Sequence, residues 1–161
     1  MILKKEKIHR YMRHIIIPEI GGVGQKKLLD SSILICCDHL SDSALMLYYI
    51  AAMGIGKIHC HTEYALDKEL ILQNLQRLNP DIEIYISDNL YQQQAGQGFD
   101  YDAFIVFSEK AEISFGFSNL ENKPIILTAA AGDCGYLKTI TKEQYLPSAI
   151  AELNSFYLNN A

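Results

Sequence analysis

The chain has 161 residues, of which 49% are hydrophobic, and its formal net charge is −5. The length predicts a single domain, and the negative charge argues against a broad nucleic-acid-binding surface, which needs an excess of basic residues. No apolar run reaches the roughly 18 to 20 residues of a membrane span, and the N-terminus lacks the apolar core of a secretion signal. We therefore expect a cytoplasmic protein that binds neither nucleic acid nor membranes, with reduced thiols at Cys36, Cys37, Cys60 and Cys134.

The first thirty residues are expected to form helices. Apolar side chains recur at helical spacing over residues 4–13 and predict a first helix. Three glycines within residues 21–24 predict a turn, and residues 25–30 predict a short second helix. The N-terminal part of the domain is therefore a helical segment, residues 1–30.

The chain then alternates apolar strand-like runs with helical segments. The run at residues 33–37 is apolar throughout, which is typical of a parallel strand covered on both faces. Ser41 or Asp42 is expected to cap a helix over residues 43–53, which is apolar nearly all round and therefore buried. Gly54 and Gly56 are expected to end that helix.

Later segments continue the same alternation. A helix is predicted to start at the cap Asp67 and to end at Asn79, and a final helix is predicted from Pro147 within a C-terminal segment, residues 141–161. Further strands are predicted at residues 57–61, 82–86, 103–107 and 125–127, with an edge strand at 135–140. The fold class is therefore α/β, a Rossmann-like, doubly wound and mostly parallel sheet spanning residues 31–140.

Two segments carry a resemblance to a known family. The segment RYMRHIIIPEIGGVGQKKLLDSSILI, residues 10–35, strongly resembles the N-terminus of the ThiF/MoeB/HesA family, bacterial relatives of the ubiquitin-activating enzymes. The resemblance continues with LYYIAAMGIGKI at residues 47–58 and, more weakly, through residues 75–132. It implies a domain that binds ATP and magnesium and adenylates the C-terminal glycine of a small ubiquitin-like sulfur carrier.

The family's phosphate-binding loop has no intact counterpart here. Relatives carry a G-x-G-G-x-G pattern after the first strand, because phosphates must approach backbone N–H groups at a helix N-terminus without meeting a Cβ. The matching stretch contains no glycine and adds two carboxylates that would repel a triphosphate: Cys37, Asp38, His39, Leu40, Ser41 and Asp42. The sequence therefore predicts that the nucleotide loop is degenerate.

The resemblance supplies a few further candidates. Glu63 lies near the family's ribose-binding acid, and Glu109 lies near its magnesium-binding acid. Arg77, within the fragment NLQR, is expected on a helix surface, because the family's crossover segment with its phosphate-contacting cations is deleted. We expect no bound cofactor, although ATP and magnesium would be required if the family activity survives.

Arg13 is the remaining candidate that the resemblance implies. Arg10, Tyr11 and Arg13 match the family's R-Y-x-R segment, which crosses to a partner and places its second arginine in the partner's ATP site. Arg13 would then act in trans. Alternatively, the segment is retained as dimer packing through its apolar side chains, namely Tyr11, Met12, Ile15, Ile16 and Ile17.

Three histidines leave a metal site open as an alternative. His39, His59 and His61 fall near the C-terminal ends of the first two predicted strands, and His59 and His61 share one strand face. Two histidines with a cysteine or Asp38 are a ligand set that zinc accepts. Their spacing matches no standard metal motif, so no metal is expected.

Taken together, these features predict a degenerate ThiF/MoeB-like domain that lacks ATP-dependent adenylation and acts as a binding or partner subunit. Its expected partners are a second copy, a full-length paralogue, or a small ubiquitin-like carrier. The alternative is a working adenylyltransferase with a remodelled site, which activates a sulfur carrier in thiamine or molybdopterin-type biosynthesis.

Overall fold

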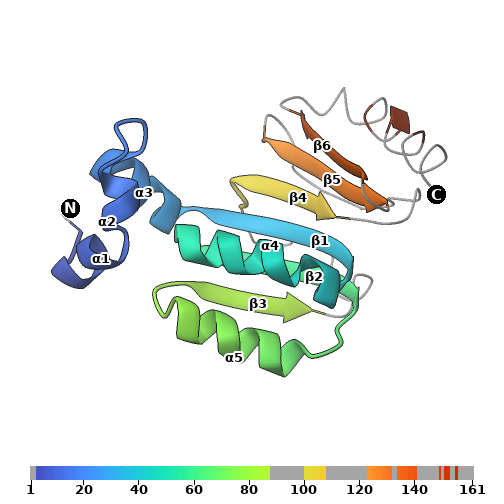
Figure 1. The fold of residues 1–161 in the computed structure, drawn as a ribbon, viewed down its shortest axis with the longest axis horizontal. Coiled ribbons are helices and arrows are strands. Elements are labelled where there is room, and N and C mark those ends of the chain that lie inside the picture. The colour runs from blue at the N-terminus through green and yellow to red at the C-terminus, as the bar shows by residue number, and fades with distance from the viewer. Residues whose placement is uncertain are drawn as a thin grey trace.

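The computed structural model describes residues 3–87, 100–107, 123–131 and 134–140, together with residues 149, 151, 152 and 155. These residues form one sheet of six strands in the order β3-β2-β1-β4-β5-β6. Neighbouring strands are parallel except for β6, which is antiparallel to β5 at one edge (Figure 1). In chain order they are β1 (Ser32–His39), β2 (Lys57–Tyr64), β3 (Glu83–Ser87), β4 (Ala103–Phe107), β5 (Ile125–Ala131) and β6 (Cys134–Ile140). The predicted Rossmann-like, mostly parallel sheet is confirmed.

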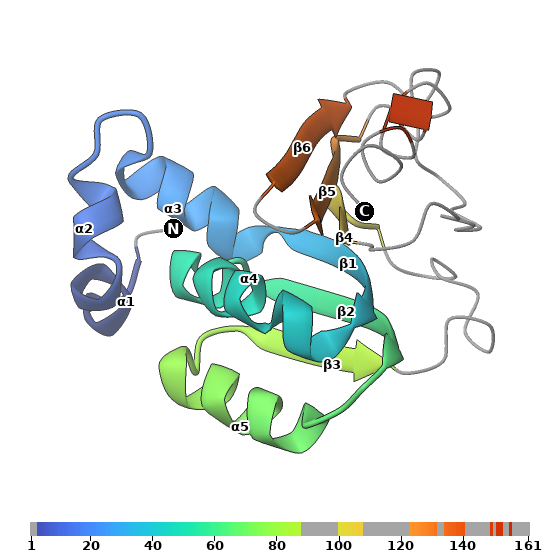
Figure 2. The ribbon, with the colours of Figure 1, turned by 45° about the vertical axis from the view of Figure 1, so that its right-hand side comes forward.

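Five helices accompany this sheet in the described part of the chain. Two of them, α4 and α5, lie against one face of the sheet, while α1 to α3 gather beyond one end of β1 (Figures 1 and 2). None of the described helices has the length and apolar character needed to cross a membrane. Their bounds are α1 (Lys5–Arg10), α2 (Met12–Ile15), α3 (Gly21–Asp30), α4 (Leu40–Met53) and α5 (Lys68–Leu78).

Strand alternation divides the core into two clusters. One cluster lies between the sheet and the helices α4 and α5, and it includes Ile35, Leu47 and Leu75, none of them exposed. The second lies on the opposite sheet face around Leu34 and Phe104. Both faces of the central strands are therefore buried, which explains why β1 reads as an unbroken apolar run rather than an alternating one.

The N-terminal segment is fastened to the end of the domain by buried polar contacts. The Tyr11 ring is 1% exposed, and its hydroxyl oxygen accepts a hydrogen bond of 2.8 Å from Asn79 Nδ2. Gln25, fully buried on α3, donates from Nε2 to the carbonyl oxygen of Met53 at 3.0 Å, and its Oε1 lies 2.9 Å from His14 Nδ1. The segment is thus part of the folded domain rather than a loose arm.

The structure explains why residues 54 and 56 are glycines. Gly54 caps α4 in the left-handed region, with φ 83°, and a Cβ there would meet Tyr11 Cε1 at 2.6 Å. A Cβ on Gly56 would lie 2.0 Å from the Leu29 carbonyl oxygen, because β2 starts hard against the end of α3. The prediction that a glycine ends α4 is confirmed at Gly54, whereas Gly56 lies directly before β2 and makes room for the end of α3.

Two predictions for the N-terminal segment were wrong. The first helix is interrupted at Tyr11, so residues 4–13 form α1 and part of α2 rather than one helix. The glycines predicted to form a turn instead lie in the first turn of α3, which starts at Gly21 with φ 57°. The buried contacts of Gln25 hold this turn in place and override the low helix propensity of glycine.

The bounds and burial of α4 also differ from the prediction. The helix starts at Leu40, three residues earlier than expected, and its cap residue His39 makes no side-chain capping hydrogen bond. Leu45 and Tyr49 are 66% and 67% exposed, so one stripe of this apolar helix faces outward rather than being buried. The predicted C-terminal helix falls largely outside the described residues, although Ala149 is helical and buried in the second cluster.

Candidate functional site

The C-terminal ends of β1 and β2 form the edge where doubly wound sheets place their ligands. Here β1 ends at His39 and α4 begins at Leu40, with no loop residue between them. The Leu40 side chain is fully buried in the cluster beneath α4. A glycine loop, whose backbone N–H groups a phosphate can approach closely, is not found at this junction, because residues 37–42 contain no glycine.

The six residues predicted to replace the glycine loop divide between strand and helix. Cys37, Asp38 and His39 belong to β1, and the other three form the first turn of α4. Cys37 is 2% exposed, whereas the Ser41 and Asp42 side chains are exposed and joined by a 3.2 Å hydrogen bond from the Ser41 hydroxyl to Asp42 Oδ1. Negative charge therefore flanks the junction at Asp38 and in the first helical turn.

A ring stack covers the ends of β1 and β2. His39 pairs in register with Tyr64, and their rings stack with centroids 4.7 Å apart and an interplanar angle of 13°. The second strand runs to Tyr64 instead of ending at residue 61, which places Glu63 on an exposed strand position rather than in a loop. Tyr64 was not among the predicted site residues. The sequence signal that could have indicated it is an aromatic residue directly after Glu63, the candidate ribose-binding acid.

His59 and His61 lie on the opposite sheet face from His39. In register, His59 pairs with Leu34 and His61 with Cys36, whereas His39 falls on the other side of β1. Both histidines are buried, and Tyr101 Oη lies 2.7 Å from His59 Nδ1. Within the described residues, His61 Nδ1 has no hydrogen-bond partner.

Burial favours the neutral form of both histidines. It lowers the pKa of both His59 and His61, because an imidazolium is poorly solvated there, and the positive potential of the neighbouring His61 lowers the His59 pKa further. The fold does not bring His39 to this pair. No group of three or more histidine, cysteine, aspartate or glutamate side chains that could hold a metal is found among the described residues.

The outer surface of the N-terminal segment carries Arg13. Arg13 lies on α2, is exposed, and makes no hydrogen bond or ion pair with another described residue. Arg10, by contrast, donates from Nε to Asp81 Oδ2 at 2.9 Å within the same chain. Of the two arginines in the R-Y-x-R segment, one is therefore used internally and the other faces outward.

Exposed apolar side chains lie close to Arg13 in the sequence. Met12, Ile16 and Ile17 are exposed, Ile16 to 72%. Tyr11 departs from the predicted packing surface, because it is buried in its own chain beside Asn79. Arg77 is exposed on α5, and Glu109 lies outside the described residues.

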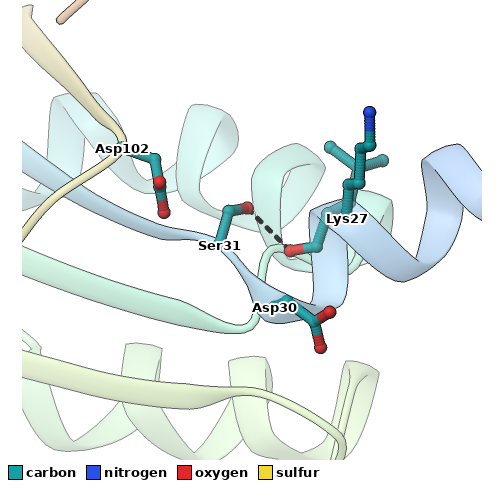
Figure 3. A pocket seen from close by; sticks show the side chains of 5 residues that line it. Lys27, Asp30, Ser31 and Asp102 are labelled. Atoms are coloured by element: carbon teal, nitrogen blue, oxygen red, sulfur yellow. Dashed lines mark hydrogen bonds between the residues drawn. The ribbon is translucent and has the colours of Figure 1, made fainter. Parts of the chain in front are cut away.

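Two depressions in the described part of the chain lie away from the C-terminal ends of the strands. One, of about 430 Å³, is lined by Lys27, Asp30, Ser31 and Asp102 and sits where β1 and β4 begin (Figure 3). Ser31 Oγ there donates to the Leu28 carbonyl oxygen at 2.8 Å. The other, of about 540 Å³, is lined by residues of α1. Neither depression coincides with the edge at which a Rossmann-like sheet binds nucleotides.

The curated proteins similar to this chain are adenylyltransferases. No protein-family model matches the chain. It is 31% identical over 136 residues to the adenylyltransferase and sulfurtransferase MOCS3 of Oryza sativa subsp. japonica, covering 82% of this chain and 29% of that protein. It is 41% identical over 56 residues to a probable adenylyltransferase/sulfurtransferase MoeZ of Mycobacterium tuberculosis, covering 35% of this chain and 14% of that protein.

A solved structure shares the fold. The crystal structure of selenomethionine-labelled PaaA matches with a TM-score of 0.70 at 15% identity, covering 99% of this chain and 65% of that chain. The match to each of the two curated relatives named above spans less than a third of that relative's length.

Proposed function

From its membership of the ThiF/MoeB family of adenylyltransferase-like proteins, we propose that this chain is a non-catalytic partner subunit without ATP-dependent adenylation. It retains the fold and the N-terminal segment, and it lacks the loop that would hold a nucleotide.

The direct junction between β1 and α4 carries this proposal. Leu40 occupies the core within residues 37–42, the stretch that corresponds by resemblance to the family's glycine loop, and the stacked rings of His39 and Tyr64 lie over the neighbouring strand ends. Hydrogen bonds to a charged group contribute about 1.5–3 kcal/mol each, and a micromolar affinity corresponds to about 8 kcal/mol. Losing three or more phosphate contacts would therefore remove a micromolar affinity for ATP, and the carboxylates of Asp38 and Asp42 oppose binding further.

The N-terminal surface supports a partner-binding role. Five of the chain's 14 lysine and arginine residues lie within residues 1–17, against one acidic residue, while the whole chain has a net charge of −5. A basic, partly apolar surface on an acidic protein is complementary to a second copy, whose remaining surface is acidic. A homodimer is the proposed assembly, and a full-length paralogue and a small ubiquitin-like carrier are the other partners that this surface could serve.

Arg13 is proposed to point into the partner. Arg10 is engaged by Asp81 and Tyr11 by Asn79, so Arg13 is the member of the R-Y-x-R segment left available to another chain. A planar guanidinium suits phosphate or carboxylate groups in a partner's site. If that partner is a paralogue with an intact loop, Arg13 serves its ATP site in trans.

Isothermal titration with Mg-ATP tests the loss of nucleotide binding. We expect no saturable heat at Mg-ATP concentrations up to about 1 mM. Saturation in that range would need a binding free energy of at least about 4 kcal/mol, which the remaining contacts are not expected to supply. A full-length family member with an intact glycine loop is the positive control. A micromolar dissociation constant for this chain would overturn the proposal and favour the alternative, a working adenylyltransferase that activates a sulfur carrier.

A further inference from the structure

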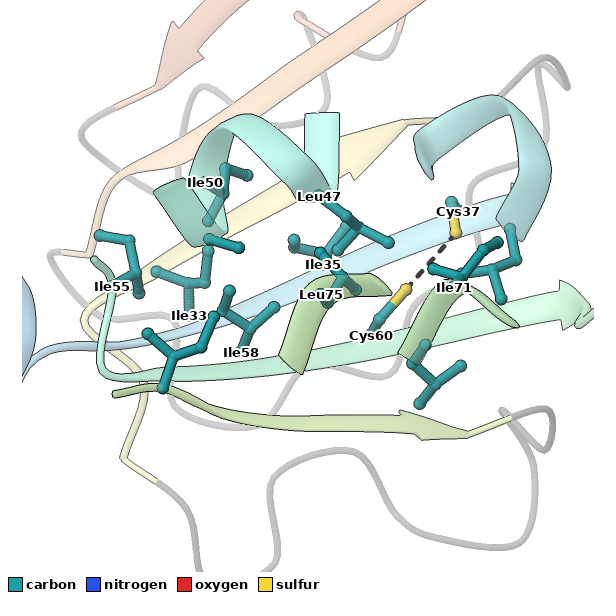
Figure 4. Close-up of a cluster of buried hydrophobic side chains, with 14 residues drawn as sticks. Ile33, Ile35, Cys37, Leu47, Ile50, Ile55, Ile58, Cys60, Ile71 and Leu75 are labelled. Atoms are coloured by element: carbon teal, nitrogen blue, oxygen red, sulfur yellow. Dashed lines mark hydrogen bonds between the residues drawn. The ribbon is translucent and has the colours of Figure 1, made fainter. Parts of the chain in front are cut away.

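Two thiols from neighbouring strands meet beneath α4. Cys37 on β1 and Cys60 on β2 lie in the same buried cluster with their sulfur atoms 3.7 Å apart (Figure 4). They are not register partners, since Cys37 pairs with Thr62 and Cys60 with Ile35, so the contact runs diagonally between the strands. Cys36 precedes Cys37 but faces the opposite side of the sheet, in the second cluster.

We propose that Cys37 and Cys60 are a redox pair that closes to an intramolecular disulfide when the protein meets hydrogen peroxide. The bond would join the C-terminal end of β1 to β2, one residue before Asp38 and three before the start of α4. The pair is therefore a modification site at the edge of the sheet where relatives place their glycine loop.

The surroundings of Cys37 favour it as the attacking thiol. Its sulfur contacts the Cys60 sulfur, and the Ser43 hydroxyl lies 3.3 Å away as a hydrogen-bond donor. Hydrogen bonding to its sulfur, from Cys60 above all, lowers the pKa of Cys37 to about 7, against the opposing effect of burial. Cys60 shows the reverse, because its hydrogen bond to Cys37 and its burial raise its pKa.

The reaction proceeds in two balanced steps. The Cys37 thiolate attacks one oxygen of hydrogen peroxide and breaks the O–O bond, which yields a sulfenic acid and a hydroxide that takes up a proton to become water. The Cys60 sulfur then attacks the sulfenic sulfur of Cys37, its thiol proton is released, and the expelled hydroxide leaves as a second water. Two thiols are oxidised by two electrons, and one peroxide is reduced to two waters.

Closure requires a local movement at the end of β1. A disulfide bond is about 2.05 Å long, so the two sulfur atoms must approach from their separation of 3.7 Å. The first turn of α4 covers Cys37 and carries the exposed residues Ser41 and Asp42 on its outer side. Transient opening of that turn would admit peroxide to the pair.

Peptide mapping of the whole protein tests the proposal. After peroxide treatment and quenching with N-ethylmaleimide, we expect a peptide pair linked through Cys37 and Cys60, two hydrogen atoms lighter than the separate reduced peptides, which reappear after reduction. Recovery of both cysteines as N-ethylmaleimide adducts in the wild-type protein would overturn the proposal. A link found only between two chains would overturn it as well.

The neighbouring thiol provides a matched control. Cys37→Ser keeps Cys36 one position away on β1 but on the opposite sheet face, where burial and the adjacent Cys37 raise the pKa of the wild-type Cys36 thiol. We expect at least a tenfold lower yield of Cys60-linked peptide in this variant under the same peroxide treatment. An undiminished yield, carried by a Cys36–Cys60 link, would show that the geometry of Cys37 is irrelevant and would overturn the assignment.

Discussion

Replacing Gly54 by alanine should destabilise the domain, because this residue admits the N-terminal segment. Gly54 has φ 83°, and a Cβ at this position would lie 2.6 Å from Tyr11 Cε1 and 2.9 Å from Gln25 Nε2. Tyr11 has little room to yield, since its ring is buried and its hydroxyl is held by Asn79. The substitution therefore combines backbone strain with overpacking at one position.

The magnitude follows from these two contributions. A left-handed conformation costs an L-residue roughly 1–2 kcal/mol, and overpacking a filled site typically costs about 1–3 kcal/mol. We expect Gly54→Ala to reduce the free energy of unfolding by about 2–5 kcal/mol, a large share of the roughly 5–15 kcal/mol that holds a domain together.

Urea denaturation followed by circular dichroism measures this loss, and another glycine supplies the control. Gly22 lies in α3 without a positive φ, and a methyl group at this position would meet only open space, so Gly22→Ala should stabilise by about 0.5–1 kcal/mol. Combining Gly54→Ala with Tyr11→Ala removes the clash with the Tyr11 ring, and the penalty should then fall to the backbone strain and the remaining close approach to Gln25. A Gly54→Ala penalty below about 0.5 kcal/mol, or one that is equal in both Tyr11 backgrounds, would refute the reasoning.

Three further outcomes are expected. Leu47→Asp should reduce the free energy of unfolding by more than about 3 kcal/mol, because it buries an unpaired charge. Leu45→Asp, on the exposed side of the same helix, should change it by no more than about 0.5 kcal/mol in the same urea assay. Equal losses in the two variants would contradict the packing of α4. Burial lowers the pKa of His59 and His61, so the unfolded state binds protons more readily than the folded state. The urea midpoint should therefore be constant above about pH 7.5. It should fall as the pH drops through about 6.5, the ordinary histidine pKa, towards the lowered pKa values of the folded state. His61→Phe should flatten that decline, and an unchanged slope would exclude this histidine as its source. Sedimentation velocity at micromolar concentration should show a dimer that survives Arg13→Met, and a monomeric wild-type protein would remove the homodimer proposal.

The strands were predictable because their apolar runs mark the buried part of each one. The prediction for β4 matches its observed bounds, Ala103–Phe107, whereas β1 and β2 extend further than predicted. Their final residues are polar or aromatic, and only pairing between the strands shows that these belong to the sheet. The unpredicted stack of His39 on Tyr64 follows from that extension.

The start of α4 illustrates why local signals failed. Ser41 and Asp42 are favourable caps in isolation, but a helix starting after them would leave Leu40 outside the core. Burying Leu40 outweighs a capping hydrogen bond of about 1 kcal/mol, since a fully buried leucine contributes roughly 1.5–3 kcal/mol. The three glycines of α3 defeat local prediction for a related reason, because Gln25 within that helix is fixed by the Met53 carbonyl at the end of α4, which is distant in sequence.

The junction at Leu40 also bears on how reversible the loss of a nucleotide site would be in evolution. Restoring a glycine there removes a side chain that fills the core beneath α4, and emptying such a position costs about 2–5 kcal/mol. That single step would remove much of a typical domain's stability before any phosphate contact existed to compensate for it. Under the proposed loss of nucleotide binding, selection acting one substitution at a time would therefore pass through a destabilised intermediate between this junction and a glycine loop. Surface substitutions would then accumulate more readily than a restored nucleotide site.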